Sequence, residues 1–116
     1  MGDRGQVKLV EGGDAIFLYT HWGAADLLSD VANALERGCE RWDDPEYLNR
    51  IIFSEMIQND VMDTTGFGIG SHQHGDVWRV VTINHNIKKV IINDGSEEES
   101  AYSYQDFVDK YTTTYV

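Results

Sequence analysis

The spacing of apolar residues changes twice along the chain, and these changes limit the folds that it can adopt. Residues 6–10 and 15–21 are mostly apolar and flank the turn sequence EGGD, which is typical of two strands joined by a tight hairpin. From residue 23 to about residue 41, apolar side chains recur every three or four positions, which predicts an amphipathic helix. Alternation returns in residues 64–70, which predicts that strands follow the helical part.

A second helix has the clearest start signal in the sequence. Asp43 or Asp44 can accept hydrogen bonds from the first free amide groups, and Pro45 suits the first helical position. Glu46 follows where the positive end of the helix dipole favours a carboxylate. We expect this helix to begin at Pro45 and to run to about Asn59.

The predicted elements follow the order β-β-α-α-β-β-β-α. Further strands are expected in TTGFGIG, DVWRVVTIN and IKKVIIND, and Ser103 can cap a short C-terminal helix. Strands grouped around a pair of helices predict an α+β fold, in which an antiparallel sheet of about five strands packs as one layer against two long helices. A chain of 116 residues is expected to form a single domain, residues 1–116, with residues 95–101 as a mobile loop.

The formal net charge of −11 at pH 7 is the strongest feature of the composition. Such a protein is not expected to bind nucleic acid directly, because contact with the phosphate backbone requires a lysine- or arginine-rich face. Two explanations of the acidity stay open: a surface solvated for a salty cytoplasm, or the mimicry of nucleic acid by an inhibitor. The acidic residues are scattered, apart from residues 96–100, which favours the first explanation.

Cysteine content and hydropathy predict a cytoplasmic protein. Cys39 is the single cysteine, so no internal disulfide can form, as is usual in a reducing compartment. Apolar runs stay short of the roughly 20 residues that span a membrane, and residues 1–10 lack the apolar core of a signal peptide. We therefore expect no association with membranes.

The segment GFGIGSHQHGD, residues 66–76, contains two candidate sites. A phosphate loop would connect a strand to a helix, but here another strand follows, so the alternating glycines rather indicate a strand pressed closely against a neighbour. His72 and His74 could chelate a metal, yet Asp76 is the only further donor beside them, and a metal site needs three or four ligands. We therefore expect no metal and no cofactor, and interpret the segment as a β-hairpin with these histidines at its tip.

Two positions are candidates for acid–base chemistry. His21 follows the second strand, where the start of a helix polarises its surroundings, and Trp22 could form the wall of a pocket. Glu55 falls inside the apolar arc of the second helix on a helical projection, so it needs a partner there. His21, Arg37 and Arg41 are the candidates for that partner. The pair of His21 and Glu55 could be catalytic, but no nucleophile accompanies it, which favours a structural ion pair.

The motifs FLYTHWG, RWDDPEYLNRIIFSEMI and TTGFGIG resemble those of a group of short proteins of unknown function from haloarchaea, bacteria and some phages. The resemblance covers residue 4 to about residue 93. It implies no activity, but it agrees with the salty-cytoplasm explanation of the acidity. The shared signature falls on Tyr19, His21, Trp22, Arg41, Trp42, Glu55 and Gly66.

Three functional hypotheses follow from the sequence. The favoured one is a non-enzymatic binding or accessory protein, a monomer or a homodimer, that meets a protein partner through an aromatic surface containing Tyr19, Trp22, Arg41 and Trp42. The second is a small enzyme that uses the histidine and glutamate named above as acid and base. The third is a phage-type acidic inhibitor that imitates nucleic acid.

Overall fold

The structure is a computed structural model that describes residues 3–95 and 99–112 of the chain. Within these ranges the α+β class predicted from the sequence is confirmed. The elements are β1 (Gly5–Glu11), β2 (Asp14–Thr20), η1 (Ala24–Asp26), α1 (Leu27–Arg37), η2 (Cys39–Arg41), α2 (Pro45–Ile57), β3 (Phe67–Gly70), β4 (Arg79–Asn84), β5 (Lys89–Asn93), β6 (Ser100–Ser103) and α3 (Tyr104–Tyr111), where η marks a 3-10 turn.

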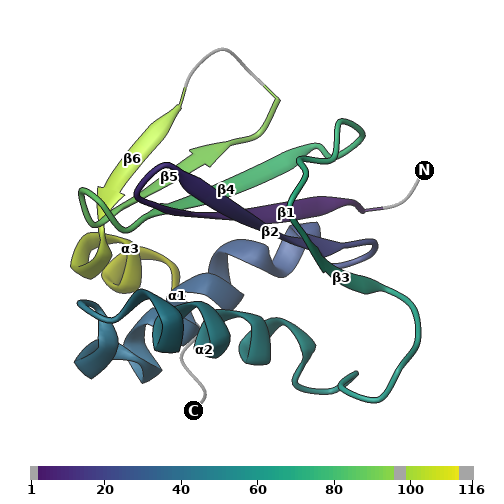
Figure 1. The fold of residues 1–116 in the computed structure, drawn as a ribbon, viewed down its shortest axis with the longest axis horizontal. Helices are drawn as coiled ribbons and strands as arrows, with labels where there is room; N and C mark the ends of the chain where they lie inside the picture. The colour runs from purple at the N-terminus through teal and green to yellow at the C-terminus, as the bar shows by residue number, and fades with distance from the viewer. Residues whose placement is uncertain (1–2, 96–98, 113–116) are drawn as a thin grey trace.

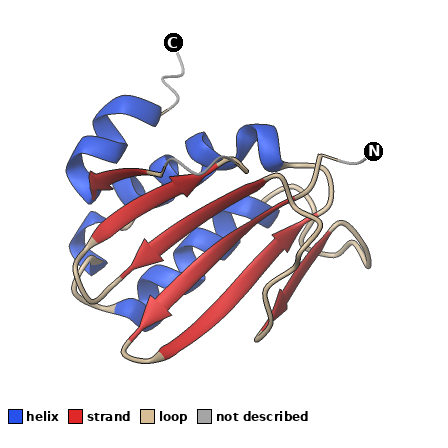
Figure 2. Ribbon diagram, turned by 90° about the horizontal axis from the view of Figure 1, so that it is seen from above, coloured by secondary structure: helices blue, strands red, loops and turns tan. Residues whose placement is uncertain are grey.

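The strands form one sheet, and the α-helices cover one of its faces (Figures 1 and 2). The strand order is β3-β2-β1-β4-β5-β6, and neighbours are antiparallel except for β1 and β4, which run parallel. The prediction of an antiparallel sheet of about five strands was therefore wrong, because the described residues form a mixed sheet of six strands. The additional strand, β6, begins at Ser100, inside the expected mobile loop 95–101, of which residues 96–98 lie outside the described residues.

The segment between β3 and β4 is a crossover, and the predicted hairpin was wrong. These two strands lie on opposite sides of the β1–β2 pair, so residues 71–78 cross the face of the sheet that carries no helix (Figure 2). Gln6 fixes this crossing, since its Oε1 accepts a hydrogen bond from His74 N at 3.0 Å and its Nε2 donates to His74 O at 3.5 Å. The hairpin does not form because β4 pairs with β1, a buried strand of seven residues, and not with β3, which has four.

α1 is shorter than the helix predicted over residues 23–41. It ends at Arg37, and Gly38 is its C-cap residue, whose missing side chain lets α1 and α2 approach closely. A Cβ atom on Gly38 would lie 3.1 Å from Ile51 Cδ1 and 3.2 Å from Leu48 Cδ1. The residues on either side of α1 form the 3-10 turns η1 and η2.

α2 and α3 begin where the sequence predicted. Pro45 is the first residue of α2, and the Ser103 hydroxyl caps α3 by accepting a hydrogen bond from Asp106 N at 3.1 Å. Asp44 is the N-cap residue of α2, but its side chain makes no capping hydrogen bond. α2 ends at Ile57, slightly earlier than predicted.

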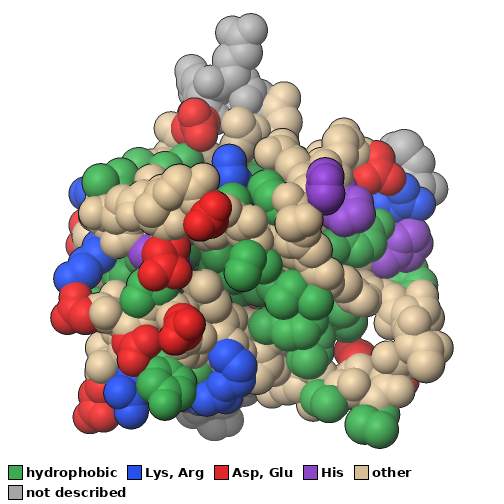
Figure 3. All heavy atoms as spheres, viewed as in Figure 1, with side chains coloured by type: hydrophobic (Ala, Val, Ile, Leu, Met, Phe, Trp, Pro, Cys, Tyr) green, Lys and Arg blue, Asp and Glu red, His purple; other side chains and the backbone are tan. Residues whose placement is uncertain are grey.

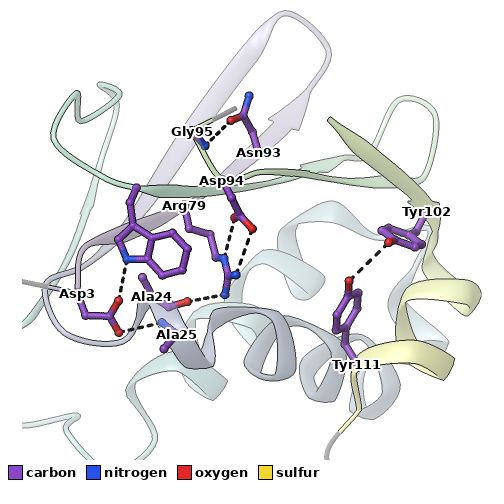
Figure 4. Close-up of polar contacts among 10 residues, drawn as sticks. Asp3, Ala24, Ala25, Arg79, Asn93, Asp94, Gly95, Tyr102 and Tyr111 are labelled. Atoms are coloured by element: carbon purple, nitrogen blue, oxygen red, sulfur yellow. Dashed lines mark hydrogen bonds and ion pairs between the residues drawn. The ribbon is translucent and has the colours of Figure 1, made fainter. Parts of the chain in front are cut away.

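The junction between β2 and α1 is held against the start of β4. Arg79 Nη1 donates to Ala24 O at 3.0 Å, and the same guanidinium forms a bidentate pair with Asp94 at 2.8 and 3.2 Å. The Asp3 carboxylate accepts a hydrogen bond from Ala25 N at 2.9 Å, which caps the start of η1. Figure 4 shows these contacts converging from three distant parts of the chain. The junction therefore has a fixed position relative to the sheet.

The hydrophobic core fills the space between the sheet and the helices. Burial of apolar surface is the main favourable contribution to folding. The fully buried residues of this core include Val7, Val31, Leu35, Leu48, Ile52, Val81, Ile83, Val90 and Phe107. In the part of the chain that the structure describes, no helix is both long enough and apolar enough to cross a membrane.

Candidate functional site

A cleft of about 530 Å³ opens where β2 ends and β3 begins. Its walls come from the β2–α1 junction, the first turns of α1, the end of α2 and the segment 58–65. On the face drawn in Figure 3, hydrophobic side chains gather below the edge of the sheet, and acidic atoms are visible in the hollow beside them. The cleft thus combines an acidic surface with an aromatic one.

Carboxylates are the only charged side chains among the described residues that line the cleft, beside neutral polar side chains. Asp26 and Asp30 come from the start of the first helical segment, Glu55 from α2, and Asp60 and Asp63 from the segment that follows α2. Neither lysine nor arginine is found among the described residues that line it. Like charges around a partly enclosed space produce a strong local potential, because protein walls screen it less than water does. The cleft therefore favours a cationic occupant.

Asp30 has the most strongly altered acidity in the cleft. Burial, together with the neighbouring carboxylates of Asp26 and Glu55, raises the pKa of Asp30 from 3.8 to about 7. A carboxyl group with this pKa is only partly ionised near neutral pH. A cation placed beside it would favour the ionised form, so that binding of the cation would release a proton.

Two aromatic rings provide the apolar part of the lining. Trp22 is 59% exposed, and Phe67 at the start of β3 is partly buried. Gly66 has a φ of +97°, and a Cβ atom there would lie 2.7 Å from Trp22 Cζ3. A close approach thus occurs at Gly66, which precedes β3 and meets the Trp22 ring, and not along the glycine face of the strand as predicted. At Gly68 and Gly70 the prediction was wrong, because a Cβ atom there would meet nothing within 4 Å.

Glu55 has a cationic partner on the neighbouring helix, as its place in the apolar arc predicted. Arg37 Nε donates to Glu55 Oε1 at 3.1 Å, and Arg37 Nη2 donates to Ile51 O at 3.2 Å. The side chain of Glu55 is 14% exposed and that of Arg37 is 50% exposed, so the ion pair lies at the rim of the cleft. The partner is thus Arg37, and neither His21 nor Arg41.

His21 and Tyr19 belong to a different cluster, on the face of the sheet that the crossover covers. Tyr19 Oη and His21 Nδ1 lie 3.1 Å apart, and the Tyr19 ring lies 4.3 Å from the ring of His74. The His21 ring meets Trp22 edge-on at 4.8 Å. Within the described residues no hydrogen bond or ion pair joins His21 to Glu55, so the expected acid–base pair is not assembled.

Arg41 and Trp42 lie in the connection between α1 and α2, and neither lines the cleft. Trp42 Nε1 donates to Leu35 O at 2.9 Å, and its ring meets the Tyr104 ring edge-on at 5.5 Å. The Arg41 guanidinium lies 4.8 Å from the centre of the Tyr47 ring. The contacts of Trp42 join the helices to one another, which is a structural role.

The remaining histidine candidates lie in the crossover. His72 Nδ1 is 3.1 Å from Ser71 Oγ at the surface, while His74 packs on the Tyr19 ring. Nowhere in residues 3–95 and 99–112 do three or more His, Cys, Asp or Glu side chains form a group that could hold a metal ion.

Protein-family models, curated proteins and solved structures were compared with this chain. None of them matches it. The interpretation of the cleft therefore rests on its own geometry and chemistry.

Sequence reasoning selected Trp22 and Glu55 of the cleft but missed its other acidic residues and Phe67. Asp30 lies outside the apolar stripe of its helix, so a helical projection assigns it to the solvent. The structure buries it partly, because the end of α2 and the segment 58–65 cover that side of α1. A usable signal was present in the two aspartate-rich stretches AADLLSD and QNDVMD, which border the two helices.

Proposed function

We propose that this chain is a non-enzymatic binding protein that holds a positively charged segment of a partner protein in the cleft. The observation that carries the proposal is the half-buried Asp30 carboxyl, which shares a concave space with aromatic rings and further carboxylates. Burying like charges together costs free energy in the free protein, and an incoming cation removes that cost. The site is therefore suited to a lysine or arginine side chain.

The aromatic walls support the same class of occupant. A cation within about 6 Å of an aromatic ring is attracted by its quadrupole, and the contact contributes about 0.5–1 kcal/mol at exposed sites. Trp22 offers a largely exposed indole, and Phe67 a second ring. Lysine and arginine side chains also carry long apolar stems that can pack on these rings. An enzymatic role has weaker support, because His21 and Glu55 have separate partners.

The proposal is tested by calorimetric titration with two blocked octapeptides at low ionic strength. One alternates threonine and lysine, and the other alternates threonine and glutamate. We expect the lysine peptide to bind and the glutamate peptide not to bind. Substitution of Asp30→Asn is expected to weaken binding of the lysine peptide about three- to tenfold, since a partly buried charge contact is lost.

The matched control is Glu36→Gln, which removes one negative charge from the exposed side of the same helix. This variant changes the net charge of the protein equally but does not touch the cleft. Equal weakening by Asp30→Asn and Glu36→Gln would show that the peptide responds to overall charge only. That result, or equal binding of both peptides, would overturn the proposal.

A further inference from the structure

Among the described residues no strand pairs with the outer edge of β3, and the ladder determines which of its backbone groups face outward. β3 is the terminal strand of the sheet order, and its inner edge pairs with β2. His21 N donates to Gly66 O at 2.8 Å, which identifies residue pair 21 and 66 as a hydrogen-bonded pair. Hydrogen-bonded and non-hydrogen-bonded pairs alternate along an antiparallel ladder. The backbone groups of Gly68 and Gly70, paired with Tyr19 and Phe17, are therefore also hydrogen-bonded to β2. The N–H and C=O groups of Phe67 and Ile69 consequently point outward, away from the sheet.

This edge lacks the features by which proteins usually protect a terminal strand. Edge strands are commonly blocked by lysine, by proline or by inward-pointing charges. Residues 64–75, TTGFGIGSHQHG, contain no lysine, arginine, aspartate, glutamate or proline, in a chain whose net charge is −11. Ile69 is also 64% exposed. The edge is therefore open to pairing with another strand.

The open edge and the acidic cleft are continuous. Thr65 and Phe67, at the start of β3, both line the cleft. Phe67 pairs with the buried Thr20, on the side of the sheet that faces the helices. A strand added beside β3 would alternate its side chains above and below the sheet. Every second side chain would then point to the helix side, where the carboxylates lie.

We propose that a basic, extended segment of the partner adds to the edge of β3 as a seventh strand and places a lysine or arginine side chain in the cleft. The proposal rests on the proposed function and adds the mode of binding to it. Phe67 and Ile69 together offer two donors and two acceptors, so up to four backbone hydrogen bonds form. The cleft supplies charge selectivity, and the backbone ladder supplies alignment.

Charge complementarity identifies the occupant as basic and not as a second copy of the chain. Two copies joined through β3 would bring two acidic clefts and two net charges of −11 together. Like charges at an interface oppose association. A cationic segment instead neutralises the carboxylates that surround the start of β3.

N-methylated peptides test the backbone pairing separately from the charge. In an extended strand, residues whose side chains point to one face also direct their N–H groups to one edge, and the residues between them direct theirs to the other edge. If lysine side chains of the threonine–lysine octapeptide point into the cleft, only one of the two residue types donates its N–H to β3. Two isomers are therefore compared, one N-methylated at every lysine and one at every threonine.

We expect one isomer to bind about tenfold more weakly than the other, as the loss of the two hydrogen bonds that the peptide donates to Phe67 O and Ile69 O requires. Equal affinities of the two isomers would overturn the strand addition. If the unmethylated lysine peptide still binds and Asp30→Asn still weakens it, the proposed function survives that result. Failure of the unmethylated peptide to bind would overturn both.

Variants of the protein give a second measurement. Ile69→Pro removes an outward N–H group, and proline is tolerated in edge strands at such positions. Ile69→Thr changes the side chain but keeps that donor. We expect Ile69→Pro to weaken binding of the lysine peptide several-fold more than Ile69→Thr, with circular dichroism confirming that both variants are folded. Equal effects of the two substitutions would contradict the pairing.

Discussion

The indole ring of Trp22 lies against the backbone of Gly66, with no space for a larger residue between them. A Cβ atom on Gly66 would come within 2.7 Å of Trp22 Cζ3, and the φ of +97° is itself unfavourable for other residues. This contact sets the position of the Trp22 ring relative to Phe67, the second aromatic residue of the cleft, because Trp22 follows β2 and Gly66 directly precedes Phe67 at the start of β3. The shape of the cleft therefore depends on a glycine that does not line it.

Substitution of Gly66→Ala is expected to lower the free energy of unfolding by about 1–3 kcal/mol, because it strains the backbone and displaces the indole. Urea unfolding measures this loss. Gly68→Ala is the control, since a Cβ atom there meets nothing within 4 Å. We expect the control to change stability by less than about 0.5 kcal/mol. Similar losses in both variants would contradict the role assigned to the Trp22 contact.

Asp30→Asn is expected to stabilise the protein in a pH-dependent way. The unfolded chain loses the Asp30 proton near pH 3.8, whereas the folded protein keeps it up to about pH 7. Between these values the folded state binds more protons, so the contribution of Asp30 to stability falls as the pH rises from about 4 to about 7. The urea midpoint of Asp30→Asn should exceed that of the wild type at pH 8 and approach it at pH 4. An equal difference at both pH values would show that Asp30 titrates normally.

The ion pair between Arg37 and Glu55 is suited to a double-mutant cycle. Arg37→Met leaves a mostly buried carboxylate without its cationic partner and with the neutral amide of Gln58 as its remaining side-chain donor, so we expect a loss of about 1–3 kcal/mol. Glu55→Gln alone should cost less, because a neutral amide is easier to bury. The coupling free energy is expected to be about 0.5–1 kcal/mol, since half of the Arg37 side chain is exposed. Strictly additive losses would mean that the two groups do not interact in solution.

His85 is expected to destabilise the protein in acid. The ring is buried, with Nε2 2.7 Å from Asn49 Oδ1 and Nδ1 3.5 Å from Tyr104 Oη, and burial lowers the pKa of His85 below 6.5. Below pH 6.5 the unfolded chain takes up a proton that the folded protein resists, so stability falls as the pH falls through this range. His85→Gln should flatten this part of a urea-midpoint profile recorded from pH 7 to pH 4.5. An unchanged slope would assign the acid sensitivity to another group.

Local patterns in the sequence predicted where the helices and strands occur better than they predicted which of them lie side by side. Pro45 and Ser103 mark helix starts because capping depends on residues close in the chain. Glu55 was expected to need a partner, since its place in the apolar arc of the helix turns it away from solvent, and Arg37, one of the three candidates, is that partner. These predictions need only the geometry of a single helix.

The crossover and the cleft could not be predicted in this way. The alternation in β4 is compatible with pairing to β3 or to β1, and only the competition between these edges decides. The raised pKa of Asp30 likewise depends on segments that come together only in the folded protein. The expected pair of His21 and Glu55 failed for the same reason, because His21 lies with Tyr19 on the face of the sheet that the crossover covers, whereas Glu55 pairs with Arg37 on the helix side.

The parallel pairing of β1 with β4 has a consequence for biosynthesis. β1 is made well before β4, the strand that completes its second edge and ends at Asn84. A nascent chain on the ribosome therefore carries the β1–β2 hairpin with one edge of β1 exposed until β4 has emerged. Contacts between such distant segments slow folding, so a chaperone that shields this hairpin would protect the newborn protein from aggregation during that interval.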